Sequence, residues 1–519
     1  MKRILVLLAV FLLGTFPVLA DVKVPSLFSD HMVLQQEMPV PIWGVADPGE
    51  RVTVKIGDVQ ATTEADPKGN WRVKLPALKA NTLGQTLSIT GKNTLILKDV
   101  LVGEVWFCGG QSNMEMGLGG CNAPQDIAAA NLPAIRQIRI DHRALAKPST
   151  EVFGRWEVCH PASAPGFTAV GFYFARRLQK DTGLPIGLID DNWGGTRIEP
   201  WIPPEGFERE PALRHTLSDL KKWEQEYRVN LGKSLDAVEK WASATRQALA
   251  TPDSDLPSPP SIPENPLANN GNPISLYNGM IHPVVPYAIK GALWYQGESN
   301  GGESEEYYHK MRALIGGWRQ VWHQGDFPFY FVQLANWLQP NNNPAGGDGW
   351  AKVRMAQLKS LQIPQTGMAV IIDIGDANDI HPRNKFDVGE RLALWALRHD
   401  YGKKDLIASG PLYKSLDVEG NRIRISFDAV GTGLMVGKKE GRNPTMEDRS
   451  GTLKRFAIAG KDRKWVWANA IIDGNTVVVS SPDVPNPVAV RYAFTMNPEG
   501  ANLYNREGLP ASPFRTDEW

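Results

Sequence analysis

The stretch 101–404 alternates apolar runs of strand length with segments of helical spacing. "VLVGEVWFC", "PIGLIDDNW" and "IKGALWYQ" are such apolar runs. Between them, "GFYFARRLQKDTG" has helical spacing at Phe172, Ala175 and Leu178, and Gly183 can end this helix in a left-handed conformation. Strands separated by helices pair in parallel, and the helices then cover both faces of the sheet. We therefore predict an α/β domain over this stretch, a three-layer α/β/α sandwich with a parallel sheet.

Two flanking stretches, 21–100 and 405–519, show no helical period. "VTVKIGDVQATTEADPKGNWRVKLPAL" in the first and "NRIRISFDAVGTGLMV" in the second alternate apolar with polar residues and contain turn-forming glycine, aspartate or proline. In the second stretch, the "DGN" of "KWVWANAIIDGNTVVVSS" signals a hairpin turn. The lengths suit small β domains of the sandwich type, and we expect one in each stretch, with the second packed beside the first.

A charged helical insertion, 212–250, interrupts the α/β domain. Its apolar residues recur at i, i+3 and i+6 in two sets, Leu217, Leu220 and Trp223, then Leu235, Val238 and Trp241. The following "TPDSDLPSPPSIPENP" is rich in proline and cannot form a regular element. We expect a helical hairpin and then an extended linker that ends near residue 270. The pair can be a solvated scaffold, shape the rim of an active-site crevice or bind a partner.

The first twenty residues have the pattern of a cleaved secretory signal. Lys2 and Arg3 form a basic start, "ILVLLAVFLL" is a short apolar run, and "VLA" ends at Ala20 with residues that a signal peptidase accepts. No later run is long and apolar enough to span a bilayer. We expect residues 1–20 to be removed and the mature chain to be exported, either to the periplasm or out of the cell.

Charge and cysteine usage exclude some functions. The formal net charge is zero, so nothing points to nucleic acid as a partner. The three cysteines, Cys108, Cys121 and Cys159, lie in no cluster with zinc-ligand spacing, and we expect no metal. An odd count leaves one thiol unpaired, and a Cys108–Cys121 disulfide or three small buried side chains are both compatible with the sequence.

Four polar clusters each follow an apolar run of the predicted sheet, at 111–113, 193–196, 296–300 and 376–381. In an open parallel sheet, the carboxyl ends of the strands meet at one crevice. Clusters that are distant in the sequence are therefore expected to meet in space. This coincidence predicts a functional site more strongly than any one of the clusters does.

The residue types in these clusters suit acyl transfer. A serine hydroxyl such as Ser112 attacks an ester when a base accepts its proton, and His381 is the histidine that follows a predicted strand beside acidic residues. A carboxylate should hold the imidazole, and Asp379 and Asp376 are nearby in the sequence. Ser112 also lies where a helix N-cap is expected, so it can cap a short helix and attack esters as well.

An attacked ester carbonyl needs N–H donors for its developing negative charge. The backbone N–H groups of Ser112 and Gly195 and a side-chain amide of Gln296 or Asn300 can supply them. Gly195 lacks a Cβ, so its backbone can approach a ligand closely.

Four sequence blocks, "GQSNMEM", "NWGGTRIEPW", "WYQGESN" and "DIHPRNK", together with the opening "PSLFSDHMVLQQEMPVPIWG", resemble the sialate O-acetylesterase family of the SGNH-hydrolase superfamily. The resemblance spans most of the chain. It implies an SGNH-type fold, Ser112 as nucleophile and His381 as base. It also implies Gly195 and a residue of "QGESN", for which we take Gln296, in the oxyanion hole. No cofactor is implied.

The third member of the triad departs from the superfamily pattern. That pattern has aspartate three residues before the histidine, where this chain has Asn378. We favour Asp379, with Asp376 and Glu298 as alternatives. A Ser–His dyad without a carboxylate is also possible.

The predicted activity is that of an exported serine esterase that removes O-acetyl groups from sialic acid or related sugars through an acyl-serine intermediate. Two alternatives are an esterase for acetylated xylan or pectin and a carbohydrate-binding protein without catalysis. Arg197 can pair with a sialic acid carboxylate or form a structural ion pair. The possible substrate-binding residues are Asn113, Trp193, Arg197, Glu298 and Asn300, and Trp201 and Trp294 can also line a sugar site.

Overall fold

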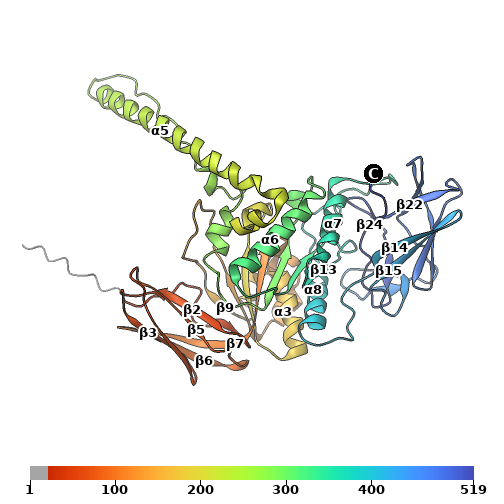
Figure 1. The fold of residues 1–519 in the computed structure, drawn as a ribbon, viewed down its shortest axis with the longest axis horizontal. Coiled ribbons are helices and arrows are strands. Elements are labelled where there is room, and N and C mark those ends of the chain that lie inside the picture. The colour runs from red at the N-terminus through yellow and green to blue at the C-terminus, as the bar shows by residue number, and fades with distance from the viewer. Residues whose placement is uncertain (1–20) are drawn as a thin grey trace, which may run out of the picture.

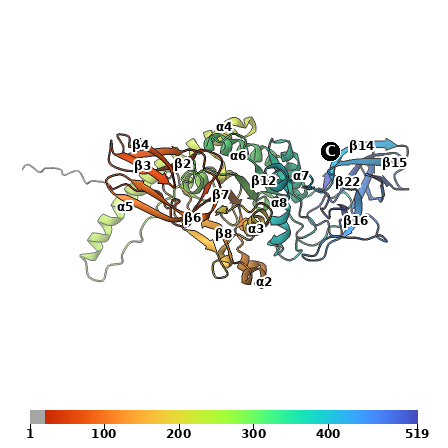
Figure 2. The same cartoon turned by 90° about the horizontal axis from the view of Figure 1, so that it is seen from below.

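The computed structural model describes residues 21–519, so the predicted signal sequence at 1–20 lies outside the described residues. Figures 1 and 2 show N-terminal strands at one end, a centre rich in helices, and C-terminal strands at the other end. The expectation that the two β domains pack beside each other is therefore wrong, because the central sheet and its helices lie between them. Within the described residues, no helix is long and apolar enough to cross a membrane.

The central sheet has the strand order β13-β12-β11-β7-β10-β8-β9. Neighbouring strands along this order pair in parallel, except for the antiparallel edge pair β8 and β9. The parallel sheet predicted for 101–404 is therefore present. Its strands are β7 (Thr94–Gly110), β8 (Leu132–Arg139), β9 (Trp156–Cys159), β10 (Ile186–Asn192), β11 (Gly291–Tyr295), β12 (Phe329–Val332) and β13 (Thr366–Ala369).

Strand β7 joins the central sheet to the N-terminal strands. Its first half alternates exposed and half-buried residues and pairs with β6, whereas every residue from Val100 to Gly110 is buried. The change has a physical reason, because strands covered on both faces are apolar throughout. The expected domain boundary at residue 100 thus falls inside one continuous strand. The other N-terminal strands are β1 (Val33–Gln35), β2 (Val40–Val45), β3 (Arg51–Ile56), β4 (Val59–Glu64), β5 (Asn70–Leu75) and β6 (Asn81–Thr90).

Helices pack against both faces of the central sheet. Successive residues of a strand point to opposite faces. On β7, the Trp106 ring lies 4.9 Å from Phe174 of α3, and the Phe107 ring lies 5.0 Å from Trp318 of α6, measured between ring centroids. Gly183 ends α3 in the left-handed conformation, as predicted. The α-helices other than α5 are α1 (Ser112–Glu115), α2 (Pro124–Ala128), α3 (Ala169–Thr182), α4 (Pro204–Arg209), α6 (Glu306–Trp322), α7 (Gly349–Lys359) and α8 (Lys385–His399).

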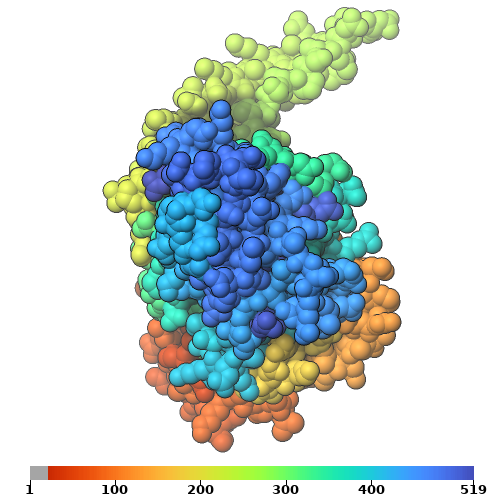
Figure 3. Space-filling view, turned by 90° about the vertical axis from the view of Figure 1, so that its right-hand side faces the viewer, coloured from red at the N-terminus to blue at the C-terminus, as the bar shows by residue number. Residues whose placement is uncertain are grey.

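The insertion forms one helix, α5 (His215–Leu249), and the predicted helical hairpin is wrong. Trp241 follows Trp223 by eighteen residues, which is five helical turns, so the two apolar sets share one side of a continuous helix. The proline-rich linker returns along α5, and the Trp241 indole donates a hydrogen bond to the Pro257 carbonyl at 2.7 Å. In Figures 1 and 3, α5 projects away from the rest of the molecule.

The C-terminal strands form small antiparallel sheets, as expected for 405–519. The predicted "DGN" turn joins β20 to β21, with Asp473 opposite Thr476 and Gly474 at a φ of 61°. The strands are β14 (Leu412–Glu419), β15 (Arg422–Asp428), β16 (Leu434–Lys438), β17 (Met446–Glu447), β18 (Phe456–Gly460), β19 (Trp465–Trp467), β20 (Asn469–Asp473), β21 (Thr476–Ser480), β22 (Pro487–Tyr492), β23 (Leu503–Asn505) and β24 (Phe514–Arg515).

The three cysteines are buried and form no disulfide, which settles the alternative between a Cys108–Cys121 bridge and buried thiols. Burial raises the pKa of the Cys108 thiol well above its ordinary value. The pKa of Cys159 is raised by burial to about 12. Thiols in such surroundings behave as small apolar side chains.

Candidate active site

The chain turns sharply between the end of β7 and the start of α1, and Ser112 is the first residue of that helix. Gly110 makes the turn at a φ of 143°. A Cβ at this position would lie 2.2 Å from the Tyr295 carbonyl oxygen of β11, so only glycine fits. This turn places Ser112 at the carboxyl end of β7, beside the end of β11.

Ser112 and His381 are in contact although 269 residues separate them in the chain. His381 Nε2 lies 2.8 Å from Ser112 Oγ. The prediction that Ser112 caps the helix is wrong, because the N-cap residue is Gln111 and Ser112 follows it. The Ser112 hydroxyl is therefore not used by the helix, and its partner is the imidazole. A serine and a histidine at this distance form the nucleophile and base pair of acyl transfer.

Asp379 is the carboxylate that lies against His381. Its Oδ1 is 3.4 Å from His381 Nδ1 and also accepts the His381 backbone N–H at 2.8 Å. Asp376 instead accepts the backbone N–H of Asn378 at 2.9 Å. Glu298 accepts a hydrogen bond from the side chain of Asn113 at 2.6 Å. Of the three carboxylates considered, Asp379 has the geometry to hold the imidazole.

The loop after β10 brings Gly194 to Ser112, and Gly195 is the next residue of this loop. A Cβ on Gly194 would lie 3.3 Å from Ser112 Cβ, and the Gly194 N–H donates to Glu115 Oε2 at 2.6 Å. Gly195 has a φ of 74° and open space around it. Within 21–519, the backbone N–H groups of Ser112 and Gly195 have no hydrogen-bond acceptor. Both donors are thus available to an oxyanion.

Gln296 and Asn300 hold the neighbouring loops instead of supplying a third donor. The Gln296 amide donates to the Thr196 carbonyl at 3.2 Å and to Asn300 Oδ1 at 2.7 Å. The Asn300 amide donates to Glu199 at 3.0 Å and to Glu303 at 2.9 Å. Both side chains are buried, and each amide has used both of its hydrogens. The prediction that Gln296 or Asn300 donates to the oxyanion does not fit this geometry.

Among the predicted substrate-binding residues, two are partly exposed and two others are buried in the core. Trp193 is half-buried and stacks on His142, with ring centroids 4.3 Å apart and ring planes at 7°. Arg197 is also half-exposed and forms ion pairs with Glu199 and Glu303. Trp201 and Trp294 are buried in the core against each other, so the expectation that they line a sugar site is wrong.

A buried polar network behind Ser112 was not found by sequence reasoning. The Lys385 ammonium donates to Asn113 Oδ1, while the Asn113 amide donates to Glu298 at 2.6 Å and to the Ile380 carbonyl at 3.0 Å. Glu298 Oε2 is buried and has no partner among the described residues, and burial raises the pKa of this carboxyl. Asn113, Glu298 and Lys385 therefore connect α1 to the loop after β11 and to the start of α8.

A sequence signal for Lys385 does exist. Lys385 is the first residue of α8, and Asn384 caps this helix by accepting the Asp387 N–H at 3.2 Å. A cation at a helix N-terminus is unfavourable because the helix dipole is positive there. A lysine directly after a capping asparagine therefore indicates that another part of the fold requires its charge.

Comparison with known proteins decides the family. The chain is 30% identical to the sialate O-acetylesterase of Rattus norvegicus over 538 residues, which cover 94% of this chain and 93% of the relative. The chain belongs to the sialate O-acetylesterase family. Its residues 267–398 also match the family model described as carbohydrate esterase, sialic acid-specific acetylesterase.

Two further relatives agree with this assignment. The sialate O-acetylesterase of Homo sapiens is 29% identical over 547 residues and is covered to 91%. The crystal structure of XAC1771, a carbohydrate acetylesterase from Xanthomonas citri, is 36% identical, with a TM-score of 0.78 and coverage of 96% of this chain and 100% of the other. The family resemblance expected from the sequence blocks is confirmed. As a member of the sialate O-acetylesterase family, the chain is a carboxylic ester hydrolase, which rejects the alternative of a carbohydrate-binding protein without catalysis.

The buried lysine of this esterase gives a prediction for stability. Burial lowers the pKa of Lys385 from 10.5 to about 8. Between these two values the unfolded chain keeps a proton that the folded protein has released, so the contribution of Lys385 to the free energy of unfolding rises with pH and is lowest below about pH 8. The difference between the two pKa values corresponds to about 3 kcal/mol in the free energy of unfolding.

The measurement compares wild type with Lys385→Met in urea unfolding at several pH values. The difference in unfolding free energy, wild type minus variant, is expected to increase by about 3 kcal/mol between pH 7 and pH 10.5. Lys180→Met, which removes an exposed lysine from α3, is the matched control. Parallel curves for wild type and Lys385→Met would contradict the prediction.

Proposed function

We propose that this member of the sialate O-acetylesterase family is an exported serine esterase that hydrolyses O-acetyl esters of carbohydrates through an acyl-serine intermediate. The contact of 2.8 Å between Ser112 Oγ and His381 Nε2 carries the proposal. A three-layer SGNH-type domain over 101–404, flanked by β domains at 21–100 and 405–519, belongs to the same proposal. The helices on both faces of the parallel sheet and the family membership support it.

The proposed reaction begins when Ser112 Oγ attacks the acetyl carbonyl while His381 Nε2 accepts its proton. The negative charge on the carbonyl oxygen is stabilised by the N–H groups of Ser112 and Gly195, each worth roughly 3–4 kcal/mol by typical deletion data. His381 then protonates the sugar oxygen as the alcohol leaves. Water, deprotonated by the same imidazole, attacks the acyl-serine, and the imidazolium returns this proton to Ser112 Oγ as acetate leaves. Asp379 orients the imidazole in both halves of the reaction.

The first candidate substrate is an O-acetylated sialic acid. The curated relatives from rat and human are named sialate O-acetylesterases. The test is a panel that measures acetate release from O-acetylated sialic acids, acetylated xylan and acetylated pectin oligosaccharides. Activity on none of these esters would contradict the proposed function.

The second candidate, an acetylated neutral glycan, is favoured by the state of Arg197. A free arginine beside Gly195 would suit the carboxylate of a sialic acid. Here the guanidinium is already paired with Glu199 at 2.9 Å and with Glu303. Its charge is compensated within the protein, which reduces the advantage of an anionic sugar. The XAC1771 protein, described as a carbohydrate acetylesterase, is compatible with either candidate.

Asp379→Asn is expected to lower kcat about tenfold to a hundredfold. Loss of a buried triad aspartate costs about 10⁴-fold, but Asp379 is 42% exposed, so water can replace part of its effect. Asp376→Asn, which changes a carboxylate of the same loop that does not contact His381, is the matched control and should stay near the wild-type rate. The assay is kcat for a chromogenic acetate ester. Equal losses in the two variants would reject Asp379 as the third member.

A further inference from the structure

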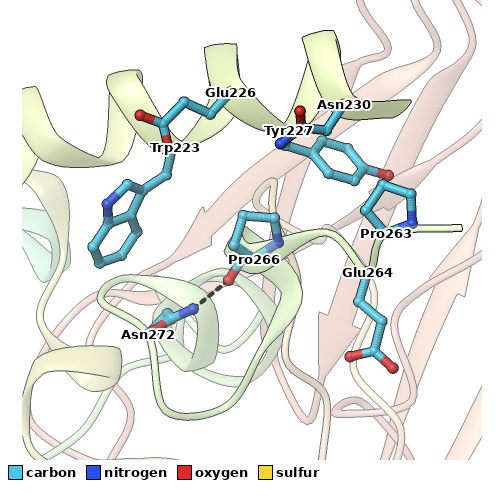
Figure 4. A pocket seen from close by; sticks show the side chains of 8 residues that line it. All are labelled: Trp223, Glu226, Tyr227, Asn230, Pro263, Glu264, Pro266 and Asn272. Carbon is cyan, nitrogen blue, oxygen red and sulfur yellow. Dashed lines mark hydrogen bonds between the residues drawn. The ribbon is translucent and has the colours of Figure 1, made fainter. Parts of the chain in front are cut away.

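A cleft of about 390 Å³ lies between the first half of α5 and the segment 263–272. Figure 4 shows it with the helix above and the returning segment below. Trp223 and Tyr227 are one helical turn apart on the same side of α5, and Pro263 and Pro266 face them from the returning segment. The volume is in the range of about 300–1,000 Å³ that small ligands occupy in proteins.

The aromatic side chains of the cleft are open to solvent. The Trp223 residue is 37% exposed, and Tyr227 is half-exposed one turn later. Aromatic rings held on a rigid helix offer flat apolar faces with a polar tip. The apolar faces of pyranose rings, which carry only C–H groups, are complementary to such surfaces.

Five polar side chains of the cleft have no partner among the described residues. Within residues 21–519, the side chains of Trp223, Tyr227, Glu226, Asn230 and Glu264 make no hydrogen bond or ion pair. These side chains include hydrogen-bond donors, hydrogen-bond acceptors and groups that both donate and accept. This mixture suits the hydroxyl groups of a sugar, each of which donates and accepts. Asn272, whose amide donates to the Pro266 carbonyl at 2.6 Å, fixes the opposite wall.

The charge of the cleft selects between classes of sugar. Glu226 and Glu264 line it, and no lysine or arginine of the described part of the chain does. Two unpaired carboxylates repel an anionic sugar and tolerate a neutral one. We propose that this cleft is a binding site for neutral pyranose units of a glycan chain.

Short connections link the cleft to the catalytic loops. Two residues after Asn272, the Ile274 N–H donates to the Glu199 carbonyl at 3.3 Å. Glu199 also pairs with Arg197, which follows Gly195 by two residues. The role of this site rests on the proposed esterase function. The site would retain a glycan whose acetyl groups are removed at Ser112. It would thus favour neutral acetylated glycans over sialylated ones.

The test uses the full chain with Ser112→Ala, so that binding is measured without hydrolysis. Cellohexaose, xylohexaose and sialyllactose are titrated into this protein by isothermal calorimetry. We expect at least one of the two neutral hexasaccharides to bind more tightly than sialyllactose. Adding Trp223→Ala should weaken binding of that hexasaccharide about tenfold. Adding Asn230→Ala should weaken it less. Val229→Ala, at an exposed residue of α5 outside the cleft lining, is the matched control.

Absence of binding by both neutral hexasaccharides would overturn the proposal. Tighter binding of sialyllactose, or an equal effect of Trp223→Ala and Val229→Ala, would do so as well. The esterase function is tested separately with a small chromogenic acetate, which Trp223→Ala should hydrolyse at the same rate as wild type. If the wild-type protein does not hydrolyse this ester, the esterase proposal is rejected and the binding result stands.

Discussion

Replacing Ser112 with alanine is expected to lower kcat for an acetyl ester about 10⁴-fold to 10⁶-fold. The variant keeps the backbone N–H donors of residues 112 and 195 but has no oxygen that can form the acyl intermediate. The small remaining rate would come from oxyanion stabilisation and substrate binding. Initial rates with a chromogenic acetate ester measure the effect, and labelling of intact protein by a fluorophosphonate checks that the hydroxyl is the reactive group.

The matched control is Ser299→Ala in the neighbouring loop. Ser299 is half-buried, and its backbone N–H donates to Gln111 Oε1 at 3.3 Å, while its hydroxyl makes no hydrogen bond with any described residue. The control should therefore keep a rate near that of wild type. A Ser112→Ala protein that is folded, by circular dichroism, and retains more than about a tenth of the wild-type kcat would reject the acyl-serine mechanism.

Replacing His381 with alanine is expected to lower kcat by a similar factor, about 10⁴-fold or more. The Ser112 hydroxyl then has no base at 2.8 Å, and the leaving sugar oxygen has no acid. His215→Ala, at an exposed histidine where α5 begins, controls for the general effect of losing an imidazole.

The double variant Ser112→Ala with His381→Ala gives a sharper test. Residues that act as one unit are not additive, so the double variant should be no slower than Ser112→Ala alone. Kinetics with the same chromogenic ester measure this. Multiplication of the two single effects in the double variant would mean that the serine and the histidine act independently, and the proposed mechanism would be wrong.

Local patterns predicted much of the fold correctly. The glycine after α3 and the "DGN" turn between β20 and β21 are fixed by neighbours in the sequence, because only certain residues adopt a positive φ. The extent of α5 could not be predicted in the same way. The two apolar sets have the same local spacing whether they lie on one long helix or on two shorter ones. Only the path of the linker past Trp241 distinguishes the two arrangements.

The candidate site was predicted in part for the same reason. Ser112 and His381 were expected to meet because parallel strands place their carboxyl ends together, a rule that depends on topology alone, and their side chains are in contact. The amide of Gln296 could not be assigned, since its partners at Thr196 and Asn300 are set by the packing of two loops. Trp201 and Trp294 were placed at a sugar site from their chemistry, although burial puts both rings in the core.

The sequence by itself determined the alternating strands and helices, the order of the four polar clusters and the family, because each is carried by residue types at short spacing. The tertiary structure alone decided which groups meet. It brings His381 to Ser112, selects Asp379 over Asp376, and places the Lys385 ammonium against Asn113 in the interior. Hydrogen bonds and burial depend on distances of a few ångströms between segments hundreds of residues apart, and no local pattern contains those distances.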